Sequence, residues 1–260
     1  MKYIFIILSF FLNSLAYANE GYTYTSGIAK SLNLPEHVVT LIIVSLILIV
    51  LGLFYRSKLA SLKNVVEPDK SISLRNIIES YGEFIYAQCR TVIGDKETPK
   101  YFEFIGALFL FILFSNLIGL IPGFMPPTEN INTTLALGVA SFLYYNYVGC
   151  KEQGTLNYLK HFAGPLWYMA VLILPIELIS NAVRPLSLAM RLRGNIYGDH
   201  LVVGVFSSIF EPYSQYLLPI PFLLLGLLVC FIQAYVFTVL TMVYISLATA
   251  HHDHGEEVVH

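Results

Sequence analysis

The stretch RPLSLAMRLRGNIYGDH, residues 184–200, concentrates charge within a very apolar chain. Leucine, valine, isoleucine and phenylalanine dominate on both sides of it. It nevertheless contains Arg184, Arg191, Arg193, Asp199 and His200. A charged side chain at the centre of a bilayer costs roughly 3 kcal/mol. We therefore expect the protein to use these charges. The alternative for the arginines is a basic helix end whose head groups reach the lipid surface.

On a regular helix, at about 100° per residue, several polar side chains share the side of Arg191. They are Glu177, Arg184 and Asn195, within about 40° of Arg191, and Asp199, about 80° from it. His200 and Arg193 point to the opposite side. This arrangement requires the helix to continue through Pro185, a residue type that kinks helices.

The composition indicates a helical membrane protein. Of the 260 residues, 56% are hydrophobic and 12% are charged, whereas soluble domains carry about 25% charged residues. Long apolar runs without period-2 alternation favour helices over a membrane barrel. The net charge of −2 provides no basic surface for nucleic acid, so no nucleic-acid partner is expected.

The amino end has the pattern of a secretory signal over residues 1–18. Lys2 precedes an apolar run, and Ala16-Tyr17-Ala18 resembles a cleavage site. The alternative is a short uncleaved anchor. Residues 19–37 are polar and are expected to form a loop-like segment outside the membrane.

A single helical membrane domain is expected over residues 38–250, and its first part predicts three ordinary transmembrane helices. They cover residues 38–55, 102–121 and 135–148. Basic residues follow the first and third helices but not the second, so the amino end is expected outside and the carboxyl end inside the cell. Residues 71–93 mix charged and apolar side chains and predict an amphipathic helix on the cytoplasmic surface, with its charges solvated.

The second part of the domain predicts longer helical segments. Residues 166–183 are mostly apolar but contain Glu177, and the charged stretch continues from them. Residues 213–250 contain no ionisable side chain of the Asp, Glu, His, Lys or Arg type. A helix of that length is about 57 Å long, against a core about 30 Å thick, so it must tilt strongly or break near Pro219 and Pro221. The His- and acid-rich tail, residues 251–260, is expected to be flexible rather than metal-binding.

Two amide side chains lie within apolar segments. Asn116 lies near the outer end of the second predicted span, and Gln233 lies within the last segment. Such a residue can join neighbouring helices by a hydrogen bond, or it can line an ion pathway. The residues alone leave both interpretations open.

No nucleophile elbow, phosphate loop or HExxH motif occurs in the sequence, so no catalytic residue, cofactor or metal site is expected. The charges favour ion transport instead. Arginine does not deprotonate in proteins, so Arg191 can hold a carboxylate ionised and block a cation. Asp199, His200 and Glu177 can exchange protons. Proton-exchanging groups on each side of a fixed arginine suit two separate aqueous approaches rather than one open pore.

Three sets of residues carry a family resemblance. They are SLAMRLRGNIY at 187–197, QAYVF at 233–237 followed by LTMVYISLA at 240–248, and SNLIGLIP at 115–122. Together they resemble subunit a of the bacterial rotary F-type ATP synthase. The resemblance covers roughly residues 38–250.

The resemblance implies an all-α polytopic membrane protein with about three ordinary transmembrane helices and two long, strongly tilted helices that form an intramembrane hairpin. It implies a non-catalytic stator subunit that provides two proton half-channels to a rotating ring of c subunits and couples proton movement to ATP synthesis or hydrolysis. The implied partners are the c ring, the peripheral-stalk b subunits, the rest of the synthase and membrane lipid. The implied location is the bacterial inner membrane, with a periplasmic amino end and a cytoplasmic carboxyl end.

The resemblance also implies roles for individual residues. Arg191 matches the arginine that faces the essential carboxylate of the ring and keeps the two half-channels apart. Asn195 and Gln233 match polar residues beside that arginine. His200 and Asn116 match positions on the inlet side.

Glu177 matches an acid on the outlet side. Three positions depart from the family pattern. Gly226 stands where many relatives have a second ionisable group, Gly119 stands where some have an acid, and Arg193 stands where an aromatic residue is common. The inlet half-channel is therefore expected to depend on Asp199 and His200 with ordered water.

Two other classes of function stay open on the residues alone. A secondary transporter predicts internal repeats, and no convincing repeat relates residues 38–150 to 165–250. A structural anchor for a larger complex predicts that Arg191 is replaceable. The coupling ion is expected to be the proton, with sodium as the alternative, because the ion-binding carboxylate belongs to the ring.

Overall fold

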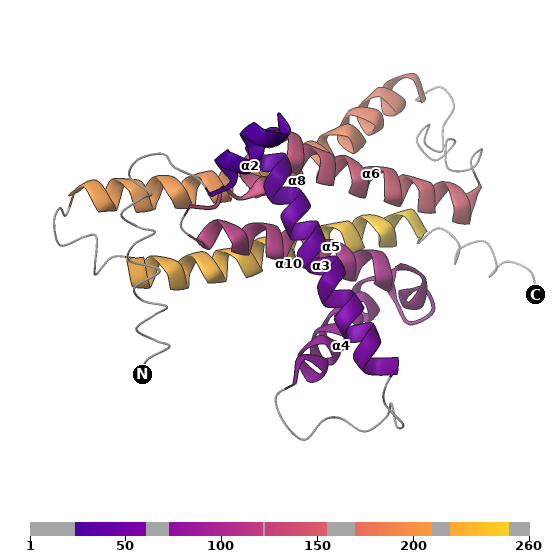
Figure 1. Ribbon diagram of the computed structural model, residues 1–260. Coiled ribbons are helices and arrows are strands. Elements are labelled where there is room, and N and C mark those ends of the chain that lie inside the picture. Colours follow the sequence, from indigo (N-terminus) through magenta and orange to yellow (C-terminus); the bar gives the residue numbers. More distant parts are fainter. Residues whose placement is uncertain (1–23, 61–72, 122, 155–169, 210–218, 250–260) are drawn as a thin grey trace, which may run out of the picture.

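The computed structural model of the chain is built of helices (Figure 1). It describes residues 24–60, 73–121, 123–154, 170–209 and 219–249. The α helices in these ranges are α2 (Tyr24–Leu32), α3 (Glu36–Ala60), α4 (Leu74–Ile93), α5 (Thr98–Leu117), α6 (Ile131–Gln153), α8 (Ala170–Ile209) and α10 (Pro219–Thr249). Two 3-10 turns, η1 (Ile118–Leu120) and η2 (Pro127–Glu129), lie between α5 and α6. The predicted signal segment 1–18 and the tail 251–260 lie outside the described residues.

Among the described residues, three stretches are long and apolar enough to cross a membrane: Glu36–Ser57, Thr98–Leu120 and Leu224–Thr249. Only 17% of the first stretch is buried inside the protein, so most of its surface is free to face lipid. Helix α6 contains the third predicted span and packs against α8 and α10. The prediction of an all-α polytopic membrane protein is confirmed.

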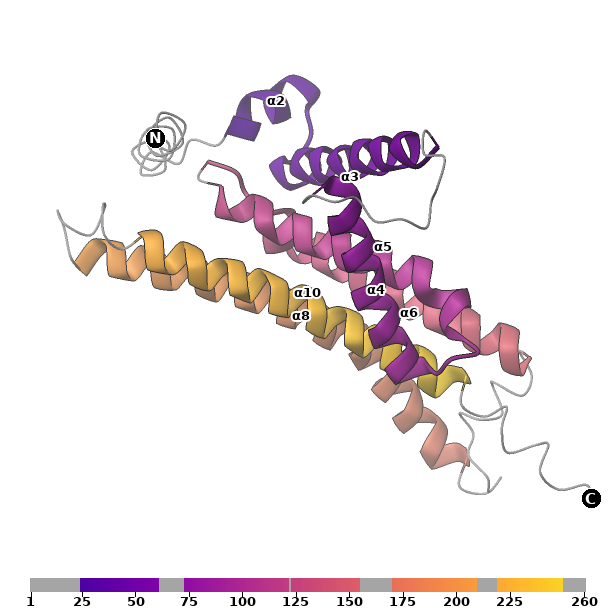
Figure 2. The ribbon, with the colours of Figure 1, turned by 90° about the horizontal axis from the view of Figure 1, so that it is seen from below.

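The helices α8 and α10 form the predicted hairpin. They contain 40 and 31 residues, which correspond to about 60 Å and 46 Å of helix. They run alongside each other in both views (Figures 1 and 2) and are in contact. Because a hydrocarbon core is about 30 Å thick, helices of this length fit only when they are strongly tilted. Helix α10 begins at Pro219, where a proline interrupts no helical hydrogen bond.

Helix α8 continues through two prolines, Pro175 and Pro185. Both views show that it is bent, with its first part turned away from the line of its second part (Figures 1 and 2). Prolines lack the N–H group and crowd the preceding turn, which accounts for such a bend. The helix is nevertheless unbroken from Glu177 to His200.

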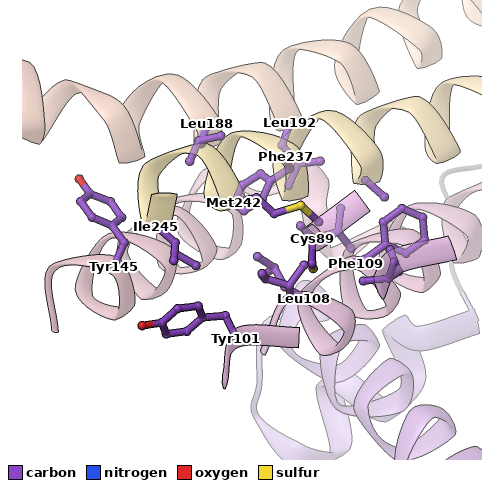
Figure 3. Packing of buried hydrophobic residues seen from close by; sticks show 14 of the residues in the cluster. Cys89, Tyr101, Leu108, Phe109, Tyr145, Leu188, Leu192, Phe237, Met242 and Ile245 are labelled. Carbon is purple, nitrogen blue, oxygen red and sulfur yellow. The ribbon is translucent and has the colours of Figure 1, made fainter. Parts of the chain in front are cut away.

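The core lies where α4, α5, α6, α8 and α10 meet (Figure 3). Helix α8 contributes Leu188, Leu192 and Ile196, which are spaced four residues apart and all buried. That spacing places them in one stripe along the helix. The stripe therefore determines which face of α8 is turned inward, and it leaves the opposite face outside the core.

Helix α6 approaches α8 closely at Gly138. A Cβ atom added there would lie 2.5 Å from the backbone carbonyl oxygen of Pro185. Small residues allow membrane helices to approach in this way.

We expect Gly138→Ala to lower the free energy of unfolding by about 1–3 kcal/mol, because α8 must shift to admit the methyl group. The measurement is the midpoint of thermal unfolding in detergent. The matched control is Gly52→Ala in α3, where an added Cβ meets nothing within 4 Å, and it should not lower the midpoint. Equal midpoints for the two variants would contradict the close contact.

Two predictions about polar segments are wrong. Residues 24–32 form helix α2 rather than a loop. The backbone N–H of Tyr24 donates to the carbonyl oxygen of Gly123 at 2.9 Å, and its ring packs on Phe124. Arg75 of α4, expected to be solvated, is 2% exposed and pairs with Glu79 at 2.6 Å. Both errors concern features that the local composition of a segment does not report.

Candidate functional site

Arg191 lies on the outward face of α8. Its side chain is exposed, whereas Leu188 and Leu192 beside it are buried. Within the described ranges, Arg191 forms no hydrogen bond or ion pair. The chain thus presents a permanent positive charge without an internal partner among these residues, and that charge is available to another molecule.

Small residues surround Arg191 on this face. Ser187, Gly194 and Gly198 project within about 60° of it on a regular helix. A Cβ atom added at Gly194 or Gly198 would meet nothing within 4 Å. We call Ser187, Arg191, Gly194 and Gly198 the α8 strip. A strip of this kind allows another helix to approach the backbone of α8 closely.

Asn195 lies one turn beyond Arg191 and connects α8 to α10. Its Nδ2 donates a hydrogen bond to Oε1 of Gln233 at 2.5 Å. Gln233 is 2% exposed, and its Nε2 has no hydrogen-bond partner among the described residues. Through this hydrogen bond, Gln233 joins α10 to α8. A buried amide with unused donor capacity is also able to receive a further polar group or a water molecule.

Arg184 has different surroundings from Arg191, although residue spacing places the two on one face. The guanidinium carbon of Arg184 lies 5.1 Å from the ring centroid of Tyr244 in α10. The charge of Arg184 also acts on the nearby hydroxyl group of Tyr145 in α6. Sequence reasoning missed both tyrosines, because an aromatic residue in an apolar helix carries no local signal of its partner.

Asn116 belongs to a separate polar cluster at the carboxyl end of α5. It is 3% exposed, and its Oδ1 accepts a hydrogen bond from Oγ1 of Thr128 at 2.8 Å. The Asn116 Nδ2 and the Ser115 Oγ are buried without a hydrogen-bond partner among the described residues. Asn116 therefore ties the loop at η2 to α5. Thr128 was not expected, because nothing in the sequence distinguishes it from other loop threonines.

Glu177, Asp199 and His200 have defined backbone positions in α8, but their side chains lie outside the described part of the structure. Asp199 and His200 follow Arg191 by about 12–14 Å along the helix axis, and Glu177 precedes it by about 21 Å. Along this unbroken helix, Arg191 therefore lies between Glu177 on one side and Asp199 and His200 on the other.

The glycines at positions 119 and 226 have packing environments that bear on the family pattern. A Cβ atom added at Gly119 would lie 2.7 Å from the Cβ of Pro126, so an acidic side chain there requires the loop to move. Gly226 of α10 is buried. A larger side chain at Gly119 therefore has a packing cost.

These features define a class of protein. It is a helical membrane protein whose long hairpin presents a fixed positive charge on a face that the described residues leave open.

Comparison with known proteins gives the family. Residues 38–246 match the family described as "ATP synthase A chain". "ATP synthase subunit a" of Bdellovibrio bacteriovorus is 45% identical over 218 residues, which are 84% of this chain and 93% of that protein. The proteins of the same name from Sorangium cellulosum and Solibacter usitatus are 36% and 38% identical; the matches cover 91% and 93% of this chain, and 91% and 99% of those proteins. The chain belongs to the ATP synthase A chain family.

Proposed function

We propose that this chain is the stator subunit of an ATP synthase membrane sector and provides two proton half-channels to a rotating ring of c subunits. Proton movement through them is coupled to ATP synthesis or hydrolysis. The observation that carries the proposal is the exposed Arg191, without a partner among the described residues, on the open α8 strip. The family match supports the same function.

In this proposal Arg191 faces the carboxylate of each passing ring subunit. A nearby guanidinium favours the ionised carboxylate and lowers its affinity for the proton. Because arginine keeps its own charge, no proton crosses at Arg191 itself. Asn195 and Gln233 provide a polar environment for this contact, since their hydrogen bond joins α8 to α10 beside it.

Proton-exchanging groups serve the two half-channels. His200, Asp199 and Asn116 belong to the inlet side in this proposal, and Glu177 belongs to the outlet side. The order along α8 supports this division, because Asp199 and His200 lie beyond Arg191 while Glu177 lies before it.

The energetics favour a transient contact between Arg191 and the ring. A dry ion pair pays a desolvation cost that offsets much of the Coulomb attraction, and the exposure of Arg191 lets water take part. One charge that crosses 100 mV releases about 2.3 kcal/mol. Several protons are therefore needed for each ATP, and a ring of several subunits delivers them.

The proposal places the chain in the bacterial inner membrane with a periplasmic amino end and a cytoplasmic carboxyl end. The exposed surface of α3 faces lipid or the peripheral-stalk b subunits. The other subunits of the synthase complete the assembly.

Cysteine cross-linking tests the ring-facing side of α8. The variants are Ser187→Cys, on the exposed strip, and Leu188→Cys, at a position where the natural leucine is 2% exposed. Each is made with the three natural cysteines replaced and paired with a cysteine next to the ring carboxylate. Ser187→Cys should give a disulfide with the ring subunit in membranes, and Leu188→Cys should not, because Leu188 points into the core. Equal cross-linking by both, or none by Ser187→Cys, would overturn the proposed orientation.

A further inference from the structure

Arg184 lies seven residues before Arg191 and has no part in the proposed proton pathway. Its guanidinium lies over the ring of Tyr244, 5.1 Å from the centroid, and its charge acts on the nearby hydroxyl group of Tyr145. Tyr145 is 2% exposed. One cation on α8 therefore contacts α6 and α10 together. A cation over an aromatic face gains most where water is excluded.

Two further contacts join the same three helices close to Arg184. Ser141 of α6 and Thr241 of α10 share a hydrogen bond of 2.9 Å, about one turn from the two tyrosines. The Pro185 carbonyl packs against Gly138 of α6 at a distance that admits no Cβ atom. Helices α6, α8 and α10 are thus joined pairwise by directional or close contacts at this level.

Two directional contacts of α8 flank Arg191: the hydrogen bond from Asn195 to Gln233 lies one turn beyond it, and the contact of Arg184 with Tyr244 lies two turns before it. Leu188 and Leu192 make apolar contacts, which have no preferred direction. A guanidinium over an aromatic ring is directional, since a rotation of α8 moves it off the Tyr244 ring. Positions 184 and 191 project only about 20° apart on a regular helix. A contact that fixes the rotation at Arg184 therefore also fixes the direction of Arg191.

We infer that Arg184 is a positioning residue for Arg191. Its contacts with Tyr145 and Tyr244 set the rotation of α8, and that rotation sets the direction in which the Arg191 guanidinium faces the ring. The inference rests on the proposed function, because only a partner outside the chain makes this direction matter.

The test measures ATP-driven proton pumping in inverted membrane vesicles, normalised to the amount of assembled synthase. Arg184→Met and Tyr244→Leu should each reduce pumping about fivefold. Arg184→Lys and Tyr244→Phe should restore most of it, because they keep the cation and the ring. The double variant, Arg184→Met with Tyr244→Leu, should be no worse than either single variant. Multiplied losses in the double variant, or no rescue by the conservative variants, would overturn the inference.

Tyr147→Leu is the matched control, since Tyr147 of α6 is 64% exposed, and its pumping should be unchanged. Arg191→Ala, measured in the same vesicles, separates the two claims. If Arg191→Ala abolishes pumping while Arg184→Met pumps normally, only the inference fails. If Arg191→Ala also pumps normally, the proposed function fails and the inference fails with it.

If the synthase does not assemble with Arg184→Met, a distance measurement tests the inference instead. Spin labels are attached through Val139→Cys on α6 and Met190→Cys on α8, two exposed positions, in the purified complex without its natural cysteines. Tyr244→Leu should broaden or shift the distance distribution, and Tyr244→Phe should leave it unchanged. An unchanged distribution in Tyr244→Leu would overturn the inference.

Discussion

Arg191→Ala is expected to abolish ATP-driven proton pumping in inverted vesicles while the synthase still assembles. Arg191 is exposed and forms no ion pair within the described ranges, so its removal opens no cavity and leaves no described acid unpaired. The loss should be on the order of 100-fold or more, as for removal of a charge that acts on the reacting group directly. The measurement is ATP-dependent quenching of a pH-sensitive dye.

Arg193→Ala is the control for this variant. Arg193 is also exposed on α8 but projects about 200° away from Arg191 on a regular helix. It should keep most of the pumping activity. Normal pumping by Arg191→Ala would leave the chain as a scaffold whose arginine reaches the lipid head groups.

Either substitution, Gly194→Leu or Gly198→Leu, is expected to reduce pumping by at least about tenfold. The side chain would occupy the space through which, in the proposed function, a ring helix approaches Arg191, and membrane helices meet closely only across small residues. The chain itself should fold normally, because an added Cβ at either position meets nothing within 4 Å. The measurements are pumping per assembled complex and the cross-linking yield of Ser187→Cys.

Gly52→Leu controls for this change, because Gly52 is also a helical glycine with open space around it. It gains the same helix propensity but lies on α3, away from the strip. Gly52→Leu should pump normally. Full pumping by Gly194→Leu and Gly198→Leu would mean that no other helix uses the strip.

The membrane fold was predictable from the sequence because its causes are local. Apolar run length determined α3 and α5, and the run after Pro212 required a long helix, which the structure provides as α10. The continuity of α8 through Pro185 could not be settled in advance, since a proline can either end or bend a helix. Helix α2 was missed, and its first residue contacts the distant Gly123. The burial of Arg75 was missed because a charged residue in an amphipathic pattern is ordinarily solvated.

The candidate site was predictable at the level of residue types and helical faces. The spacing of Arg191 and Asn195 identified a shared side of one helix, and the structure adds the hydrogen bond from Asn195 to Gln233 on another helix. The same spacing misled for Arg184, because it reports direction around a helix and not the neighbours that a long side chain reaches. Tyr145 and Tyr244 become its partners only through the packing of α6, α8 and α10.

In the proposed function, the charge of Arg191 separates two half-channels. The most direct test is passive proton conductance through vesicles that keep the catalytic head and contain no nucleotide, so that the ring cannot turn. With the ring stationary, unmodified vesicles should hold a proton gradient. Vesicles with Arg191→Ala should leak, and an inhibitor that modifies the ring carboxylate should stop the leak. Vesicles with Arg191→Ala that hold the gradient as well as the unmodified ones would contradict the claim that Arg191 is the barrier.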